Sequence, residues 1–185
     1  MRKRAFDLAG ALLLFPVATP IILLLMIAIR FETPGSPLFM QRRVGRHRRE
    51  FWLFKLRTMY RETEHLPSHE LSVSKITKIG RILRKTKLDE LPQLWNILLG
   101  DMSFVGPRPC LPSQDELIAE RASRGVYSLR PGITGPAQLA GVDMSTPREL
   151  AIADALYMER QTFVVDIRYI LLTALGSGSG DAVKD

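Results

Sequence analysis

The sequence predicts an α+β domain that is mostly helical, is attached to a membrane near its N-terminus and contains a small β-hairpin. Three observations lead to this prediction. Residues 8–29 are almost wholly apolar, helical periodicity dominates the second half of the chain, and two short aromatic and aliphatic stretches flank a basic turn at residues 46–49. The length of 185 residues suits one domain, and no glycine-rich dinucleotide fingerprint is present, so we expect no Rossmann unit.

The charge balance indicates an anionic partner. A net charge of +7 and a pI of about 9.9 suit nucleic acid, a membrane surface or phosphorylated substrates. We expect no nucleic-acid partner, because no recognised reading motif is present and nucleic acid would not explain the apolar segment. The single cysteine, Cys110, excludes an internal disulfide and suits a packing role.

The apolar segment at residues 8–29 is long enough, roughly 33 Å as a straight helix, to cross the core of a bilayer. Pro16 and Pro20 each remove a helical hydrogen bond, so a strong bend or break is expected near Thr19-Pro20, with the Thr19 hydroxyl satisfying a freed carbonyl. Basic residues flank both ends, and positive charge marks the cytoplasmic side. Residues 1–30 are therefore interpreted as a re-entrant membrane helix, with a kinked single span as the alternative.

The next part of the chain predicts elements that lie at the membrane surface. Residues 38–45 and 51–59 predict a hairpin whose mixed basic and aromatic side chains suit an anionic membrane. Residues 75–87 predict a basic amphipathic helix, either interfacial or on an ordinary surface, whose apolar face comprises Ile76, Ile79, Ile82 and Leu83. Further helices are predicted at residues 113–125, 147–160 and 163–175. Residues 60–74 predict a polar helix–loop segment, and residues 176–185 a loose tail.

Asp89 and Glu90 form an adjacent pair of carboxylates three and two residues before Pro92. Because proline is tolerated only in the first turn of a helix, the helix is expected to begin near Asp89, with Asp89 as its N-cap. A helix N-terminus favours anions, so the pair is a candidate for chemistry at an anionic ligand; ordinary capping is the alternative. Arg84, five residues before Asp89, is expected to reach the same site.

Arg108 lies between Pro107 and Pro109. The two prolines fix the neighbouring backbone, and a stiffly mounted guanidinium suits a bidentate grip on phosphate or carboxylate. A surface arginine in a proline-rich turn is the alternative.

Three blocks, at residues 88–93, 100–109 and 130–135, resemble the signature blocks of bacterial sugar transferases, the monotopic polyprenol-phosphate phosphoglycosyl transferases. The resemblance extends from about residue 4 to about residue 173. Thr19-Pro20 stands where the family carries Ser-Pro, Asp7 matches a position expected to anchor near the headgroups, and Pro136 departs from the usual tryptophan. The resemblance implies a re-entrant helix at residues 1–30, a catalytic domain at residues 31–175, and a location on the cytoplasmic face of the bacterial inner membrane.

The resemblance also implies a reaction. A UDP-sugar gives its phosphosugar to undecaprenyl phosphate in two steps, through a covalent intermediate on Asp89, with Glu90 assisting and Mg²⁺ bound by Asp89; membrane phospholipids surround the site. The substrate-binding residues would be Arg57, Arg84, Arg108, Arg130, Gly132, Gln138 and Asp166. Short family members often use N-acetylated 6-deoxyhexoses, which is the expected sugar class. The alternative is a basic, membrane-peripheral binding module without catalysis.

Overall fold

The computed structural model describes residues 2–60 and 75–177. The predicted helix–loop segment after Tyr60 and most of the predicted tail lie outside these ranges. The elements, in chain order, are α1 (Arg2–Glu32), β1 (Leu38–Val44), β2 (Glu50–Leu56), α2 (Lys78–Thr86), α3 (Gln93–Leu99), β3 (Ser103–Val105), α4 (Asp115–Ser123), β4 (Gly132–Thr134), α5 (Pro136–Leu139), α6 (Pro147–Arg160) and α7 (Phe163–Ala174). Short 3-10 turns at Arg46–Arg48, Leu88–Glu90 and Val126–Ser128 complete the described part.

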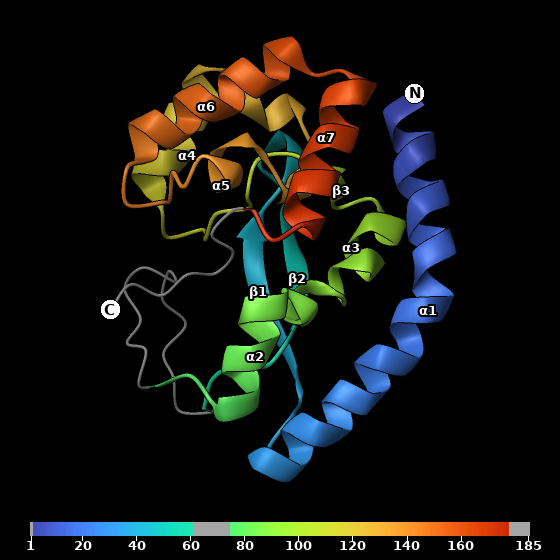
Figure 1. Ribbon diagram of the computed structural model, residues 1–185. Helices are drawn as coiled ribbons and strands as arrows, with labels where there is room; N and C mark the ends of the chain where they lie inside the picture. The colour runs from blue at the N-terminus through green and yellow to red at the C-terminus, as the bar shows by residue number, and fades with distance from the viewer. Residues whose placement is uncertain (1, 61–74, 178–185) are drawn as a thin grey trace.

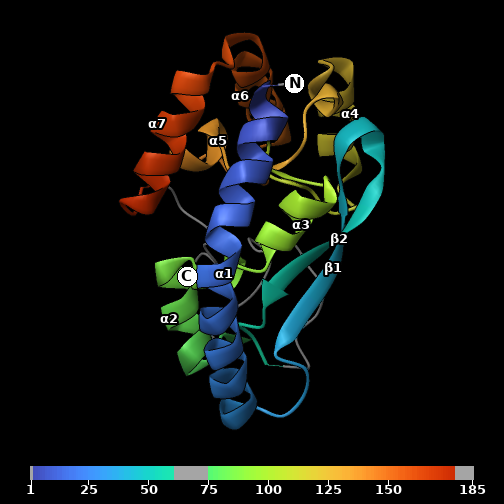
Figure 2. The same ribbon diagram turned by 90° about the vertical axis from the view of Figure 1, so that its right-hand side faces the viewer.

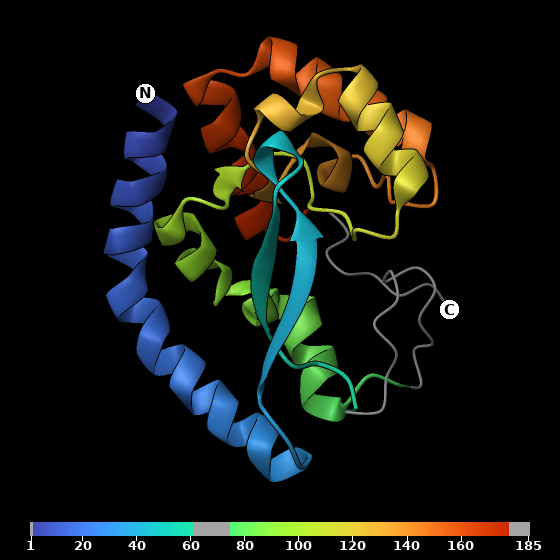
Figure 3. The same ribbon diagram turned by 180° about the vertical axis from the view of Figure 1, so that it is seen from behind.

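The elements surround a central hairpin. Strands β1 and β2 form an antiparallel pair, and β3 and β4 form a short parallel pair. Helices α4, α5, α6 and α7 gather at one end of the hairpin and α2 lies at the other, while α1 runs along one side of the whole domain (Figures 1 and 3). The predicted hairpin and the helices at residues 113–125, 147–160 and 163–175 are confirmed to within a few residues at their ends.

Helix α1 continues through Pro16 and Pro20 without an interruption, and its axis bends about half-way along its length (Figure 3). Each proline lacks the N–H that the preceding turn needs, which accounts for a bend in this part of the helix. The prediction for Thr19 was wrong in one detail: its hydroxyl donates to the carbonyl of Phe15 at 2.7 Å, and not to one of the two carbonyls that the prolines free. Such back-bonding also favours bending.

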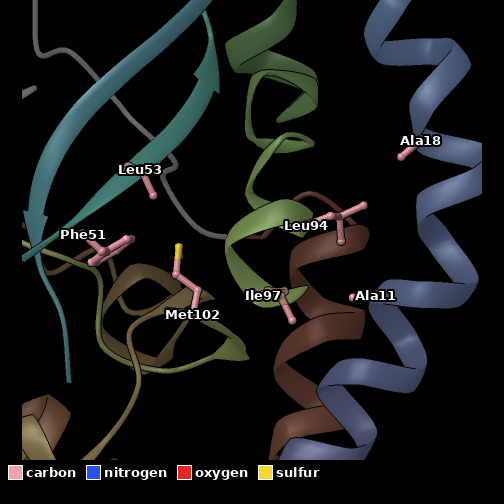
Figure 4. Packing of buried hydrophobic residues seen from close by; sticks show 7 residues of the cluster. All are labelled: Ala11, Ala18, Phe51, Leu53, Leu94, Ile97 and Met102. Atoms are coloured by element: carbon pink, nitrogen blue, oxygen red, sulfur yellow. The ribbon is translucent and has the colours of Figure 1, made fainter. Parts of the chain in front are cut away.

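Two small residues, Ala11 and Ala18, form the part of α1 that is buried against α3. They face Leu94 and Ile97 across the interface (Figure 4), and α1 lies alongside α3 and α2 (Figure 2). The opposite face of α1 is apolar and exposed, and includes Leu12, Leu13, Val17, Leu23, Leu24, Ile27 and Phe31. By length and composition, α1 is the one helix in the described ranges that could cross a membrane.

Both ends of α1 are attached to the same domain. Asp7 is buried and accepts hydrogen bonds from the Ser103 hydroxyl and the Phe104 N–H, at 3.0 and 3.2 Å. That Asp7 lies near the headgroups stays a prediction; in the structure its carboxylate pairs with β3. At the other end, Glu32 accepts from the N–H of Ile79 at 3.1 Å and so caps α2.

Helix α2 begins at Lys78 and not at residue 75, because Ile76 pairs with Met59 and Thr77 caps the helix by accepting from the Gly80 N–H at 2.9 Å. Gly80 allows the close approach of this helix to the strand end, since a Cβ there would lie 2.0 Å from the carbonyl oxygen of Thr58. Leu83 is buried as predicted, whereas Ile82 points outward.

The predicted helix start at Asp89 was wrong. Lys87 ends α2 in the left-handed region at φ 58°, residues Leu88–Glu90 form a 3-10 turn, and the α-helix begins only at Gln93. The physical reason is Pro92, which has no N–H to donate to the Leu88 carbonyl four residues earlier; the Leu91 N–H takes that carbonyl instead, at 3.3 Å. Asp89 thus lies inside the 3-10 turn and is not an N-cap.

Candidate active site

A hollow in the domain, called the central hollow below, is lined by residues from seven parts of the chain: β1, β2, the 3-10 turn, the start of α3, the loop after β3, β4 and α5. Its lining comprises Arg43, Leu53, Lys55, Glu90, Gln93, Arg108, Pro109, Gly132, Ile133 and Gln138. Asn96 fixes one side of this arrangement. Its side chain accepts from the Phe54 N–H at 3.1 Å and donates to the Trp52 carbonyl at 2.7 Å, so α3 is tied to β2.

Glu90 lines this hollow, whereas Asp89, beside it in the 3-10 turn, is not among the lining residues. Both carboxylates are buried, with 3% of Asp89 and 9% of Glu90 exposed. Glu90 forms an ion pair with Lys55 at 3.3 Å. Within the described ranges no other residue donates a hydrogen bond to the Asp89 carboxylate. Burial raises the pKa of Asp89 to about 6, with Lys55 and Arg84 opposing the rise and Glu90 adding to it.

Three cationic side chains surround the carboxylates. Burial lowers the pKa of Lys55 to about 8, although Glu90 opposes this. Arg84 donates to the Thr58 hydroxyl at 2.9 Å, and its charge acts on both carboxylates, as predicted from its spacing. Arg108 also lies within electrostatic reach of both carboxylates. The site therefore combines acids and fixed cations in a partly dry environment, where charges interact more strongly than in water.

Two residues of the hollow, Arg43 and Lys55, were not singled out by the sequence analysis. The hairpin was expected to present its basic and aromatic residues to a membrane, and only one of its faces can do so. Arg42 lies outward, 4.7 Å over the Trp52 ring, whereas Arg43 and Lys55 are buried on the face of Leu53. The sequence does contain a signal for this burial: side chains alternate between the two faces of a strand, which puts Lys55 on the same face as Leu53.

Gly132 and Gln138, which were predicted to bind substrate, both line the hollow; substrate binding by them stays a prediction. A Cβ at Gly132 would lie 2.1 Å from the Gly106 nitrogen, so this glycine permits the close pairing of β3 and β4. The Gln138 amide nitrogen donates to the Ile133 carbonyl at 3.0 Å, while its buried Oε1 has no hydrogen-bond partner in the described part. Gln138 thus offers an acceptor at the edge of the hollow.

A second hollow lies on the other side of Glu90. It shares three residues with the first, namely Glu90, Ile133 and Gln138, and is completed by Lys87, Thr134, Leu139, Thr173 and Ser177. Glu90 therefore contacts both spaces.

Arg57 and Arg130, two of the residues predicted to bind substrate, do not line either hollow. The Arg57 guanidinium donates to the carbonyls of Pro34 and Thr33, at 2.7 and 2.9 Å, and so fixes the turn that follows α1. Arg130 donates to the Gly100 carbonyl at 2.8 Å. Both arginine side chains therefore bind main-chain carbonyls of the protein itself.

Asp166, the third such residue, belongs to a buried cluster at the N-terminal end of α1. Its carboxylate is 2.6 Å from Lys3 Nζ and accepts from the Tyr157 hydroxyl at 2.5 Å. It joins α1, α6 and α7 and does not line the hollow around Glu90.

The described residues include no group of three or more side chains of histidine, cysteine or acid type arranged to hold a metal. The donor set near the hollow is two carboxylates, of which Glu90 is paired with Lys55 and Asp89 is not hydrogen-bonded to another residue of the described ranges. Mg²⁺ commonly takes one or two carboxylates together with substrate phosphates, so a single carboxylate ligand fits this ion.

Buried acids among fixed cations define an enzyme site for a phosphorylated substrate, and comparison with known proteins agrees with this class. The chain belongs to the bacterial sugar transferase family, whose sequence model matches residues 1–178. Members of this family named as sugar phosphotransferases transfer sugar phosphate, and the protein is accordingly an enzyme of that kind.

Three relatives illustrate the similarity. The UDP-glucose:undecaprenyl-phosphate glucose-1-phosphate transferase of Caulobacter vibrioides is 39% identical over 94% of this chain and 68% of its own length. The sugar transferase EpsL of Bacillus subtilis is 38% identical over 92% and 84%, respectively. The UDP-N-acetylgalactosamine-undecaprenyl-phosphate N-acetylgalactosaminephosphotransferase of Aeromonas hydrophila is 30% identical over 92% of this chain and 42% of its own length.

Proposed function

We propose that the protein transfers a phosphosugar from a UDP-sugar to undecaprenyl phosphate, giving undecaprenyl-diphosphate-sugar and UMP, as the first membrane step of glycoconjugate assembly. The observation that carries the proposal is the buried Asp89 carboxylate among Lys55, Arg84 and Arg108. These cations offset the charge of a diphosphate, which otherwise repels an attacking carboxylate. The names of the relatives supply the polyprenol acceptor and the sugar donor.

The proposed route has two displacements at one phosphorus. An Asp89 oxygen attacks the phosphorus that carries the sugar, the bond to the bridging oxygen breaks, and UMP leaves with that oxygen. An oxygen of undecaprenyl phosphate then attacks the same phosphorus and frees the Asp89 carboxylate. Glu90 would assist the incoming acceptor, and its contact with both hollows supports this role.

Mg²⁺ is part of the proposal. Asp89 and the substrate phosphates would hold it, and it would supply further positive charge at the diphosphate when bound. Removal of divalent ions with a chelator is expected to abolish turnover, and added Mg²⁺ to restore it.

The direct test is the release of UMP by purified protein with Mg²⁺ and undecaprenyl phosphate. The panel of donors includes UDP-glucose and UDP-N-acetylgalactosamine, which occur in the names of the relatives, and a UDP-N-acetylated 6-deoxyhexose, the class expected from the sequence. Intact-protein mass spectrometry without acceptor lipid is expected to show a phosphosugar adduct that maps to Asp89. An adduct on Glu90, or product formation with no adduct at any time, would contradict the two-step route. Absence of UMP with every donor would favour the non-catalytic binding module.

We also propose that α1 enters and leaves the membrane on the cytoplasmic face of the bacterial inner membrane, so that the protein is monotopic and contacts phospholipids through the exposed apolar face of α1. Attachment of both ends of α1 to one domain supports this topology. Lys3 pairs with Asp166 and Glu32 with Ile79, although a straight helix of 31 residues would separate its ends by roughly 46 Å. A simple span would put these ends on opposite sides of the bilayer.

Reporter cysteines at positions 2 and 179, in a Cys110→Ala background, test this topology. An impermeant thiol reagent is expected to label both in inverted vesicles and neither in intact spheroplasts. Pro20→Leu, which restores a missing helical hydrogen bond, is expected to shift the segment towards a true span. Labelling of the two positions from opposite sides in the protein with Pro20 would contradict the re-entrant topology.

A further inference from the structure

The loop that carries Arg108 is held by a series of hydrogen bonds to its main chain. Four successive carbonyls, those of residues 107–110, each accept a hydrogen bond, and the donors lie on three elements, namely β4, α4 and β1. The donors are the Gly132 N–H to Pro107 at 2.9 Å, Arg121 Nη1 to Arg108 at 2.8 Å, Arg43 Nη1 to Pro109 at 3.1 Å, and the Val44 N–H to Cys110 at 2.9 Å. The prolines at 107 and 109 carry no N–H, so this edge of the loop is fixed almost wholly through its acceptors.

Arg121 is the donor to Arg108 itself, and it is 1% exposed. Its Nε donates to Asp154 Oδ2 at 2.9 Å, and its Nη2 lies 2.7 Å from the same oxygen. Asp154, on α6, is fully buried. The guanidinium thus holds the carboxylate through one hydrogen bond from Nε and a close charge contact from Nη2, which makes no hydrogen bond within the described ranges. Nη1 donates to the Arg108 carbonyl, so one side chain links α4, α6 and the loop.

A third hollow lies beside this loop and is lined in part by Pro107, Arg108 and Pro109 and by Arg121 itself. The loop could relax into this space if the bond from Arg121 were lost. A buried ion pair is in itself weak evidence for stability, because hydrophobic replacements of similar volume are often neutral. A role in positioning the loop that carries Arg108 explains why an arginine is buried here.

We propose that Arg121, braced by Asp154, is a positioning residue that fixes the Arg108 guanidinium at the hollow through the Arg108 main chain. The inference rests on the proposed function, in which Arg108 binds a substrate phosphate. It assigns a role to two buried residues that do not line the central hollow. A small displacement of a substrate-positioning group lowers the rate strongly, so the link has a measurable consequence.

The test is a double-mutant cycle with Arg121→Lys and Arg108→Ala. Lysine keeps the positive charge beside Asp154, but its single nitrogen cannot contact the Asp154 carboxylate and the Arg108 carbonyl as the three guanidinium nitrogens do. In the presence of Arg108, Arg121→Lys is expected to lower kcat/KM for the UDP-sugar by roughly tenfold to a hundredfold. In the Arg108→Ala background the same change is expected to cost less than about threefold, because the group that Arg121 positions is gone. Arg124→Lys, on the same segment but paired with Glu120, is the matched control and should have no effect.

A second measurement does not depend on activity. Hydrogen exchange of the Val44 and Gly132 amides, which donate to this loop, is expected to accelerate in Arg121→Lys and not in Arg124→Lys. Equal activity losses for Arg121→Lys in both backgrounds would overturn the positioning role and leave the proposed function intact. An Arg108→Ala variant with full activity would also overturn the positioning role, since it would remove the phosphate-binding role of Arg108, whereas only the absence of UMP release by the wild-type protein would overturn the proposed function.

Discussion

Asp89→Asn is expected to abolish turnover and, at neutral pH, to raise the stability of the fold. An amide cannot attack phosphorus to form the proposed intermediate, and it is a poor ligand for Mg²⁺. The same substitution removes a buried group whose ionisation is disfavoured, because burial raises the pKa of Asp89 from 3.8 to about 6. Loss of activity with a gain in stability is typical of a residue placed for function.

The pH dependence of this gain follows from the direction of the shift. Between pH about 4 and about 6 the folded protein holds a proton on Asp89 that the unfolded chain has released, so wild-type stability falls as the pH rises through this range. Asparagine does not titrate and avoids the loss. The variant is therefore expected to be more stable by up to roughly 3 kcal/mol above pH about 6, with the difference vanishing below pH about 4.

Thermal unfolding in detergent from about pH 3 to about pH 8, in parallel with UMP release, measures both effects, because this range brackets the window between pH about 4 and about 6. Glu159→Gln, an exposed carboxyl on α6, is the control and should change neither property. Destabilisation by Asp89→Asn at neutral pH would mean that Asp89 is a structural ion-pair partner. Glu90→Gln should impair turnover severely but still allow the adduct on Asp89.

Arg108→Ala is expected to lower kcat/KM by about a hundredfold, or roughly 3 kcal/mol, which is the typical cost of removing a charge-assisted contact from a partly dry site. Arg48→Ala is expected to be close to wild type. Neither arginine lies in an α-helix, but Arg48 is exposed in the 3-10 turn between the hairpin strands, whereas Arg108 lines the hollow beside Glu90.

Steady-state kinetics over a range of UDP-sugar concentrations checks this expectation, with thermal unfolding to show that both variants are folded. Arg108→Lys keeps the positive charge but loses the planar guanidinium, so its kcat/KM should fall between those of the wild type and Arg108→Ala. Similar losses of kcat/KM for Arg108→Ala and Arg48→Ala would mean that both arginines act only through the net positive charge of the protein, and that the position of the Arg108 guanidinium has no special role.

The sequence by itself determined the elements and the centre of the site. Apolar periodicity and the turn residues located the hairpin and the later helices, since these signals are local. The adjacency of Asp89 and Glu90 and the two prolines around Arg108 marked residues that lie close together in the fold. Glu90 and Arg108 line one hollow, and Asp89 is within electrostatic reach of Arg108. Local spacing also placed Arg84 near the acids, only five positions from Asp89.

Tertiary structure decided which charged residues face inward. Lys55 lies in the hollow because it pairs with Glu90, 35 positions later, and this counter-charge offsets the cost of burying the lysine. Arg43 lies there too, and donates to the Pro109 carbonyl. Local pattern cannot show such a partner, so a basic strand residue was assigned to the surface. The same reason explains Asp7 and Asp166, whose partners lie 96 and 163 positions away. The start of the helix after Asp89 was decided more locally, because Pro92 lacks an N–H. The hydrogen bond from Arg121 to the Arg108 carbonyl was decided by packing between α4, α6 and the loop.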